Sequence, residues 1–375
     1  MRSGGGCLAE PGRARGGATR ARAVLAAVLV LAGCATPGNP YYDTAKAHHT
    51  PQGFRNNYLA ELGNGGANFW KWQWERLRDG LPKQPANGYG FPVAAPDVAW
   101  LRANRSRTAA TWIGHATVLL QVAGVNILTD PHITDRASPV SFAGPKRFVR
   151  PALDFDQLPH IDMVVISHNH YDHLDERTVL TLSRQPGGSP RFFVPLGNKA
   201  WFAELGITDV VELDWWDRRD FKGLEVHFTP VQHWSARGLD DRFRTLWGGW
   251  YVRAPGFRAF FAGDTGYSKD FADIRARLGP VDFAMLPVGA YEPRWFMRAQ
   301  HIDPAEAVRI HRDMGARHTL GIHWGTFELT DEPLDEPPRR LDEELARAGI
   351  DRRAFRVVRH GETWLLDGGP AVAAR

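Results

Sequence analysis

The segment SHNHYDHLD, residues 167–175, places three histidines and two aspartates within nine positions. It directly follows IDMVVI, an apolar run that is typical of a buried strand. Side chains this polar are costly at the end of a core strand unless a partner compensates them. Imidazole nitrogens and carboxylate oxygens are ligands for zinc and related metals. The segment therefore predicts metal binding through His168, His170, Asp172 and His173.

Three further residues of ligand type stand at the ends of later apolar runs. His233 follows LEVHFTPVQ, Asp264 follows FRAFFAG, and His323 follows HTLGI. A lone histidine in a strand is usually a core residue, but seven ligand-type side chains placed in this way suit two ions better than one. The only cysteines, Cys7 and Cys34, lie near the N-terminus. Ligation through nitrogen and oxygen is consistent with zinc and also permits iron or manganese.

Short β-type runs and helices alternate from residue 111 onward and must position these residues. The helix AEAVRIHRDMG has Asp303 as its cap, Pro304 just inside, Glu306 three residues after the cap and Gly315 at its end. A second helix fits DERTVLTLSR. The predicted strands are TWIGHATVLLQV, VNILTDP, DMVVIS, RFFVP, LEVHFTP, WGGWYVRA, FRAFFAGD, DFAMLPVG, HTLGIHW and FRVVRHGETWLL. The pattern predicts one mixed α/β domain, residues 54–375, without internal repeats.

Composition and charge limit the classes of partner. The chain has 375 residues, 43% of them hydrophobic and 11% aromatic, which is typical of a globular protein. Its formal charge of +4 resides in residues 1–33, which hold five arginines against one glutamate, and the remainder is balanced. Without a basic stripe interleaved with aromatic residues, we expect no nucleic-acid partner.

The first 33 residues have the layout of a secretory signal peptide. An arginine-bearing stretch is followed by AVLAAVLVLAG, which is shorter than the roughly 20 residues of a membrane-spanning helix. The sequence LAGC, ending at Cys34, resembles the bacterial lipoprotein box, in which the cysteine is acylated. An ordinary signal peptide with a chance cysteine, or an uncleaved anchor, is the alternative. We expect an exported protein that is anchored through Cys34 on the periplasmic side of the outer membrane.

Two features lie between this leader and the main domain. Residues 34–53 are rich in turn-forming and polar residues and predict a tether. In the following segment, NFWKWQWERLR, a helix would place Trp70, Trp74 and Leu77 on one face, with Trp72 elsewhere. Such a face either lies at a lipid interface or packs against the domain, and we expect core packing because aromatic residues are more often buried.

The sequence resembles a known family over most of its length. HNHYDH matches the HxHxDH signature of the metallo-β-lactamase superfamily, and QHW, FFAGDTGY and IHWGTF match its later ligand positions in order. The longer blocks TWIGHATVLLQ, LTDPHITDRASP, GPKRF, VPLGNK, ELDWW, GAYEPRWFM, QHIDPAEAVRIH and RHGE are similar to the N-acylphosphatidylethanolamine-hydrolysing phospholipase D family. The resemblance covers roughly Phe54 to Leu366. The lipoprotein box and the tether depart from that family's pattern and concern location.

The resemblance implies an αββα sandwich with two zinc ions where the sheets meet. It assigns His168, His170 and His233 to one ion, and Asp172, His173 and His323 to the other, with Asp264 bridging them. Two ions about 3.5–4 Å apart lower the pKa of a shared water, and the resulting hydroxide can attack phosphorus. The family reaction releases an N-acylethanolamine and leaves phosphatidic acid. We therefore expect a phospholipid substrate and a membrane surface as partners, with a homodimer as an open alternative.

The candidate catalytic residues are Asp172, Tyr171, His301 and His360. His301 and His360 lie inside family blocks and could protonate the leaving oxygen, whereas Tyr171 could donate to a phosphate oxygen. For both histidines a structural role that orients a ligand is the alternative, and His115, at a strand end, is ambiguous. Surface or packing positions are expected for the remaining histidines, His48, His49, His132, His160, His227, His311 and His318.

Two other functions stay open. One is a different hydrolase of the superfamily, for example a lactonase or a sugar-phosphate enzyme, with the same metals and another pocket. The other is a lipid-anchored binding protein without activity, against which the complete ligand set argues. The loop GAYEPRWFMRAQH, with Trp295, Phe296 and Met297, favours the phospholipase because it offers an apolar surface to acyl chains.

Overall fold

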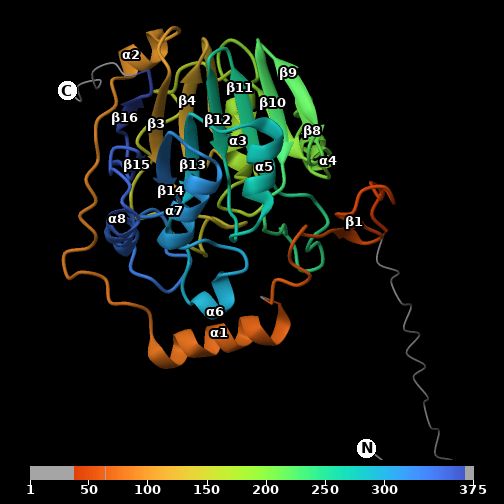
Figure 1. The fold of residues 1–375 in the computed structure, drawn as a ribbon, viewed down its shortest axis with the longest axis vertical. Coiled ribbons are helices and arrows are strands. Elements are labelled where there is room, and N and C mark those ends of the chain that lie inside the picture. Colours follow the sequence, from red (N-terminus) through yellow and green to blue (C-terminus); the bar gives the residue numbers. More distant parts are fainter. Residues whose placement is uncertain (1–37, 64, 368–375) are drawn as a thin grey trace, which may run out of the picture. The chain divides into compact units, whose positions relative to one another are not determined.

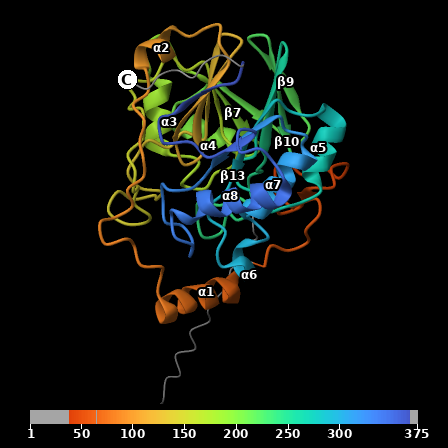
Figure 2. The same cartoon turned by 60° about the vertical axis from the view of Figure 1, so that its left-hand side comes forward.

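Two seven-stranded sheets pack face to face in the computed structural model, which describes residues 38–63 and 65–367. The predicted signal peptide and Cys34 lie outside these ranges. Helices lie on the outer side of each sheet, and Figure 2 shows α3 on one side of the strands and α5 on the other. This arrangement confirms the predicted αββα sandwich.

The first sheet has the order β16-β3-β4-β5-β6-β7-β8 (Figure 1). The opening strands β3, β4 and β5 form antiparallel hairpins, so the run TWIGHATVLLQV, predicted as one strand, is divided into β3 and β4, and β5 to β8 are parallel. Its strands are β3 (Ala109–Gly114), β4 (Thr117–Val122), β5 (Val125–Thr129), β6 (Met163–Val165), β7 (Arg191–Pro195), β8 (Val210–Leu213) and β16 (Thr363–Leu365).

The second sheet has the order β15-β14-β13-β12-β11-β10-β9. The strands β12 to β15 are parallel, and β11 runs antiparallel to both β10 and β12. Its strands are β9 (Arg218–Phe221), β10 (Leu224–Thr229), β11 (Gly249–Ala254), β12 (Phe257–Phe261), β13 (Phe283–Pro287), β14 (His318–Ile322) and β15 (Phe355–Arg356). A separate short pair consists of β1 (His49–Thr50) and β2 (Gly53–Phe54).

Except for α1 and α6, which lie at the lower edge of the domain in Figures 1 and 2, the helices cover the sheets as two outer layers. Their bounds are α1 (Gly66–Asp79), α2 (Val98–Ala103), α3 (Glu176–Ser183), α4 (Lys199–Glu204), α5 (Asp270–Leu278), α6 (Arg294–Met297), α7 (Pro304–Asp313) and α8 (Glu336–Ala348). The predicted capping box of α7 is present, since the Asp303 carboxylate accepts from the Glu306 amide and Glu306 bonds back to the Asp303 amide.

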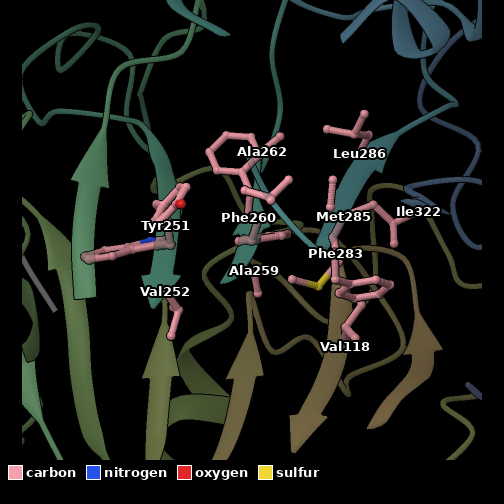
Figure 3. Close-up of a cluster of buried hydrophobic side chains, with 14 of the residues drawn as sticks. Val118, Tyr251, Val252, Ala259, Phe260, Ala262, Phe283, Met285, Leu286 and Ile322 are labelled. Atoms are coloured by element: carbon pink, nitrogen blue, oxygen red, sulfur yellow. The ribbon is translucent and has the colours of Figure 1, made fainter. Parts of the chain in front are cut away.

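Alternation along the strands divides the core into two clusters. In β4, Val118 and Leu120 belong to the cluster between the sheets, whereas Leu119 belongs to the cluster under α2, α3 and α4. This period of two is expected for a strand that is buried on both faces. Figure 3 shows Val118 of the first sheet beside Phe283 and Met285 of the second, where the two sheets pack together.

The strand directions bring the ligand-bearing segments to one edge. The strands β10, β12 and β14 run the same way, and His233, Asp264 and His323 follow their carboxyl ends. In the first sheet, β5 and β6 are parallel, and residues 167–173 follow β6. The segments that follow these strands therefore place the polar side chains at the edge where the two sheets meet.

Three further expectations need correction. The described part of the predicted tether, residues 38–53, is folded onto the domain: His48 and His49 are buried and bond the Asp214 carboxylate at 2.7 and 2.8 Å. The final predicted strand is divided, because β15 joins one sheet and β16 the other. At the crossing, Gly361 has a φ of 84°, and a Cβ there would lie 2.2 Å from the Ala94 carbonyl oxygen. The strands β8 and β9 were not predicted.

The third correction concerns the tryptophan-bearing helix α1. Core packing was expected for the face of Trp70, Trp74 and Leu77, but these side chains are exposed. Trp72 is the residue that packs inward, against Phe296. The expectation was wrong because a helical period identifies a face without showing which face the protein covers.

Candidate metal centre

Three imidazole rings converge at one point beyond the ends of β6 and β10. The Nε2 atom of His168 lies 2.8 Å from Nδ1 of His170, and Nε2 of His233 lies 3.4 Å from the same Nδ1. The rings of His168 and His233 are almost completely withdrawn from solvent, whereas His170 is partly exposed. This group is the first of the two predicted ligand sets.

A second group lies beside it. The Nε2 atoms of His173 and His323 are 3.2 Å apart, and Oδ2 of Asp172 lies 3.2 Å and 3.4 Å from them, respectively. Oδ2 of Asp264 is 3.1 Å from Nε2 of His173 and 4.0 Å from Nε2 of His233. Asp264 therefore stands between the two groups, where the sequence predicted a bridging ligand.

The outer partners of the rings fix where their protons lie. Ser167 Oγ donates to the Asp130 carboxylate and so accepts from Nδ1 of His168, at 2.9 Å. Nδ1 of His173 donates to Asp130 Oδ2 at 2.7 Å, and Nδ1 of His233 donates to the Gln300 carbonyl oxygen at 2.9 Å. Because a neutral imidazole carries one N–H, each Nε2 atom is left with a lone pair that points inward.

This donor set fits divalent cations. Three inward lone pairs and two carboxylates converge in a buried space, which is unfavourable without positive charge. Oδ1 of Asp264 accepts no hydrogen bond within the described residues, although Nε2 of His323 lies only 3.1 Å away. In each set the candidate ligand atoms lie within 4.8 Å of one another. Imidazole and carboxylate groups without thiolates suit zinc, iron or manganese.

The two ligand sets differ in their electrostatics. Burial lowers the pKa of His170 to about 4 and that of His233 to about 3, so both rings are neutral near pH 7. On the other side, burial also lowers the pKa of His323, but Asp264 and Asp172 outweigh it and raise that pKa to about 9. The field of these carboxylates attracts positive charge and is the field that a cation would neutralise.

Strained backbone holds several of these side chains in place. His115, Asp130 and His323 have φ values of 53°, 29° and 63°, which non-glycine residues rarely adopt. Next to Asp264, Gly263 has a φ of 62°, and a Cβ there would lie 2.4 Å from Cβ of Ser167. Such strain concentrates at functional sites, where the surrounding structure enforces it.

The structure brings one of the four candidate catalytic residues, His301, to the edge of the ligand cluster without making it a member of either set. Its Nδ1 atom lies 3.8 Å from Oδ2 of Asp264, and it has no hydrogen-bond partner within residues 38–63 and 65–367. The ring lies edge-on to His233 at 5.3 Å. Burial lowers the pKa of His301 to about 3.

Tyr171 and His360 are engaged elsewhere. The Tyr171 hydroxyl donates to the Arg237 carbonyl oxygen at 3.0 Å, and the Arg237 guanidinium covers its ring. His360 stacks on Trp112 at 4.1 Å and lies near Trp324, so its surroundings favour the packing role that the sequence left open. The catalytic roles of Tyr171 and His360 stay predictions that these contacts do not support.

Sequence reasoning missed the residues behind the ligands. Asp130 was not singled out, although an aspartate at the end of the buried run VNILT is the same signal that identified Asp264. His115, left ambiguous, bonds Asp172 through Nε2 at 3.0 Å and therefore orients that carboxylate. Gln300 contributes through its backbone carbonyl, which no side-chain pattern can reveal.

The fold and the paired ligand sets define a hydrolase of the metallo-β-lactamase class, and comparison with known proteins agrees. Residues 125–324 match the Beta-lactamase superfamily domain. An isothiocyanate hydrolase from Delia radicum gut bacteria has the same fold, with a TM-score of 0.56 at 20% identity over 71% of this chain and 100% of that one.

Two relatives are considerably closer in sequence. N-acyl-phosphatidylethanolamine-hydrolyzing phospholipase D 1 of Caenorhabditis elegans is 44% identical over 68% of this chain and 75% of its own length. The mitochondrial N-acyl-phosphatidylethanolamine-hydrolyzing phospholipase D of Saccharomyces cerevisiae is 36% identical over 65% of this chain and 53% of its own length. The chain therefore belongs to the N-acylphosphatidylethanolamine-hydrolysing phospholipase D family.

Proposed function

We propose that this protein is a phosphodiesterase of the phospholipase D type that acts on N-acylphosphatidylethanolamine or a related phospholipid. Water replaces the ethanolamine oxygen at phosphorus, so the products are an N-acylethanolamine and phosphatidic acid. The observation that carries the proposal is the 44% identity to the nematode enzyme, which accompanies both complete ligand sets.

The side chains provide the scaffold for this reaction. Two zinc ions, held by the two ligand sets and by Asp264, would lower the pKa of a water and neutralise charge that develops on the phosphoryl oxygens. Asp130, Ser167 and the Gln300 carbonyl hold the imidazole rings in the tautomers that bind cations. His115 holds the Asp172 carboxylate in the same way.

His301 is the group best placed to act on the substrate. Its Nδ1 atom is buried beside Asp264, at the border of the ligand cluster, and has no hydrogen-bond partner among the described residues. From there it would donate a hydrogen bond to the ethanolamine oxygen as the bond to phosphorus breaks, and the proton given up by the attacking water would convert the departing alkoxide to the alcohol. A positioned donor of this kind contributes about 10²–10⁴-fold to turnover.

The test is a turnover panel with zinc-loaded full-length protein. N-acylphosphatidylethanolamine should be hydrolysed faster than phosphatidylethanolamine, phosphatidylcholine or a simple lactone. Fast turnover of the lactone, with none of the phospholipids, would contradict the phospholipase and support another hydrolase of the superfamily.

The role of His301 is tested on two substrates with different leaving groups. His301→Ala should slow lipid hydrolysis by about 10²–10⁴-fold, and hydrolysis of a nitrophenyl diester much less, because nitrophenolate leaves without a donor. The matched control is His311→Ala, since His311 of α7 is a buried histidine whose ring bonds Thr319 of β14 at 2.8 Å. Equal losses on both substrates together with a lowered melting temperature would make His301 a packing residue.

The location is a further part of the proposal. Export and acylation at Cys34 would hold the enzyme at the periplasmic face of the outer membrane, next to phospholipid. The support is the sequence of residues 1–34 alone, which lies outside the described residues. Among residues 38–63 and 65–367, no helix has the length and apolar character that crossing a membrane requires.

A further inference from the structure

The helix α1 presents its apolar side chains to solvent. Trp70, Trp74 and Leu77 lie at positions i, i+4 and i+7 and are 70%, 63% and 77% exposed. Trp72, roughly 200° further around the helix than Trp70, is 7% exposed. A surface helix usually packs against the protein through its apolar face, whereas α1 turns its apolar face to solvent.

The inward face of α1 is firmly held. Trp72 stacks on Phe296 with ring centroids 4.9 Å apart, and its indole N–H donates to the Asp331 carboxylate at 2.8 Å. The Arg76 guanidinium lies 3.0 Å from the other oxygen of Asp331. These contacts fix the orientation of α1. Its outer face is exposed because the opposite face packs against the domain.

This face is structurally connected to the metal centre. Figures 1 and 2 both show α1 beside α6 at the lower edge of the domain, and Lys71 of α1 lies over the ring of Trp295 in α6. The chain leaves α6 toward His301, whose amide donates to the Met297 carbonyl at 2.8 Å. Arg294 of α6 donates to the His301 carbonyl at 2.8 Å. A surface that rests on α1 and α6 is therefore only a few residues from the proposed leaving-group donor.

We propose that the outer face of α1, defined by Trp70, Trp74 and Leu77, docks on the surface of a phospholipid bilayer. Indole rings favour the boundary between headgroups and acyl chains, where the ring is buried and the N–H stays hydrated. Helices that lie in this plane combine such residues with lysine and arginine, which reach the phosphates. Exposed cationic side chains occur on α1, after its end and at the end of α6, namely Lys71, Arg78, Lys83 and Arg298, although Lys71, Arg78 and Arg298 pair with Glu75, Asp79 and Glu306.

This docking surface rests on the proposed function, because it would serve to bring the enzyme to its phospholipid substrate. A lipid must leave the plane of the membrane to reach a buried metal centre, and docking through α1 would hold the adjoining α6 and His301 against the headgroups. Binding to the bilayer does not itself need turnover. The docking surface and the hydrolytic reaction can therefore be tested separately.

The binding test places a fluorescent probe on the outer face of α1 in the full chain. Leu77→Cys, with Cys7 and Cys34 both replaced by serine, is labelled with an environment-sensitive dye and mixed with vesicles of phosphatidylcholine, with and without phosphatidylglycerol. The emission should shift to the blue, more strongly with phosphatidylglycerol. A control probe at the exposed Glu343 of α8, introduced as Glu343→Cys, should not shift.

The functional test removes both indoles in Trp70→Ser/Trp74→Ser. Hydrolysis of N-acylphosphatidylethanolamine in vesicles should fall by about 10-fold or more, because burial of one large apolar side chain is already worth about that factor. Hydrolysis of a soluble nitrophenyl diester should change less than about twofold. The control Tyr42→Ser removes another half-exposed aromatic ring and should affect neither substrate.

The outcomes distinguish this inference from the proposed function. An unshifted probe at position 77, or equal shifts at both positions, overturns docking through α1 whatever the turnover. A probe that shifts without vesicles as the protein concentration rises would show that a second copy of the chain covers this face, which also overturns it. A vesicle-dependent shift with no turnover of any phospholipid supports the docking surface and contradicts the phospholipase.

Discussion

Replacing Asp130 by asparagine should weaken cation binding although Asp130 is not a predicted ligand. Its Oδ2 atom accepts from His173 Nδ1 at 2.7 Å and also from Ser167 Oγ, while Oδ1 accepts from the Ser167 amide at 2.7 Å. In each of these bonds the Asp130 oxygen is the acceptor. An asparagine that keeps its oxygen toward the Ser167 amide turns its NH₂ group toward His173.

The consequence follows from the chemistry of imidazole. Facing an N–H donor, Nδ1 of His173 must become an acceptor, so the proton moves to Nε2 and occupies the lone pair that the cation needs. The opposite rotamer of the asparagine keeps the His173 proton on Nδ1, but it places the NH₂ group against the Ser167 amide N–H, which is also a donor. Loss of an outer partner of this kind typically lowers metal affinity by about 10–100-fold, which corresponds to about 1.4–2.7 kcal/mol.

The assay is competition between the protein and a zinc chelator, monitored by elemental analysis of the protein after gel filtration. Asp130→Asn should lose one zinc equivalent at a chelator concentration that leaves the wild type with two. Asp270→Asn is the matched control, because Asp270 is equally buried but bonds Asn57 and Ser268 instead of a ligand. If Asp130→Asn retains both cations with wild-type affinity, the tautomer argument is wrong.

Three further outcomes are expected. Purified protein should carry close to two metal equivalents, and Asp264→Ala should lose most of them by elemental analysis; a wild type that stays at one equivalent in excess zinc contradicts the two-metal site. Asp214→Asn should lower the free energy of unfolding by about 3 kcal/mol in urea titrations near neutral pH. Although burial raises it, His48 and Lys46 hold the pKa of Asp214 well below its usual value. The folded state therefore binds this proton less readily than the unfolded state, and the Asp214 contribution is present above about pH 4. It disappears as the pH falls further, so the variant and the wild type should converge in acid, and a difference that grows there contradicts the ion pair. Cys34→Ser should abolish labelling by fatty acid and release the protein from the membrane fraction, and a wild type found entirely in the cytoplasm with Met1 attached contradicts the lipoprotein assignment.

The sequence was sufficient for the class of fold because the sheets are built from strands with strong local patterns. The run VNILT is buried throughout and FRAFF over its last three residues, and a polar residue follows each, so strand, edge and candidate ligand could be predicted together. The strand β9, with the sequence RRDF, carries no such pattern, since three of its four residues are exposed. It is a strand because β10 pairs with it, which is a tertiary cause.

The folded N-terminal segment illustrates a second limit. His48 and His49 lie in a stretch of turn-forming and polar residues, which predicted a tether. Their partner, the Asp214 carboxylate, lies 165 positions beyond His49 in the chain. One buried carboxylate that bonds two imidazoles and Lys46 makes the segment part of the domain. Local polarity could not show this, because polarity has the same appearance in a solvated loop and in a buried ion pair.

At the candidate metal centre the sequence predicted the side chains that converge but not the protons on them. A histidine binds a cation only through a nitrogen that carries no proton, and the other nitrogen's partner decides which one that is. That partner is Asp130 for His173, 43 positions earlier, and the Gln300 carbonyl for His233, 67 positions later. A signature that spans six residues therefore predicts which side chains are candidate ligands, whereas the protonation of their nitrogens is determined by distant strands and loops that the fold brings together. This division explains why substitutions outside the signature, at Asp130 above all, should act on metal affinity as strongly as substitutions near it.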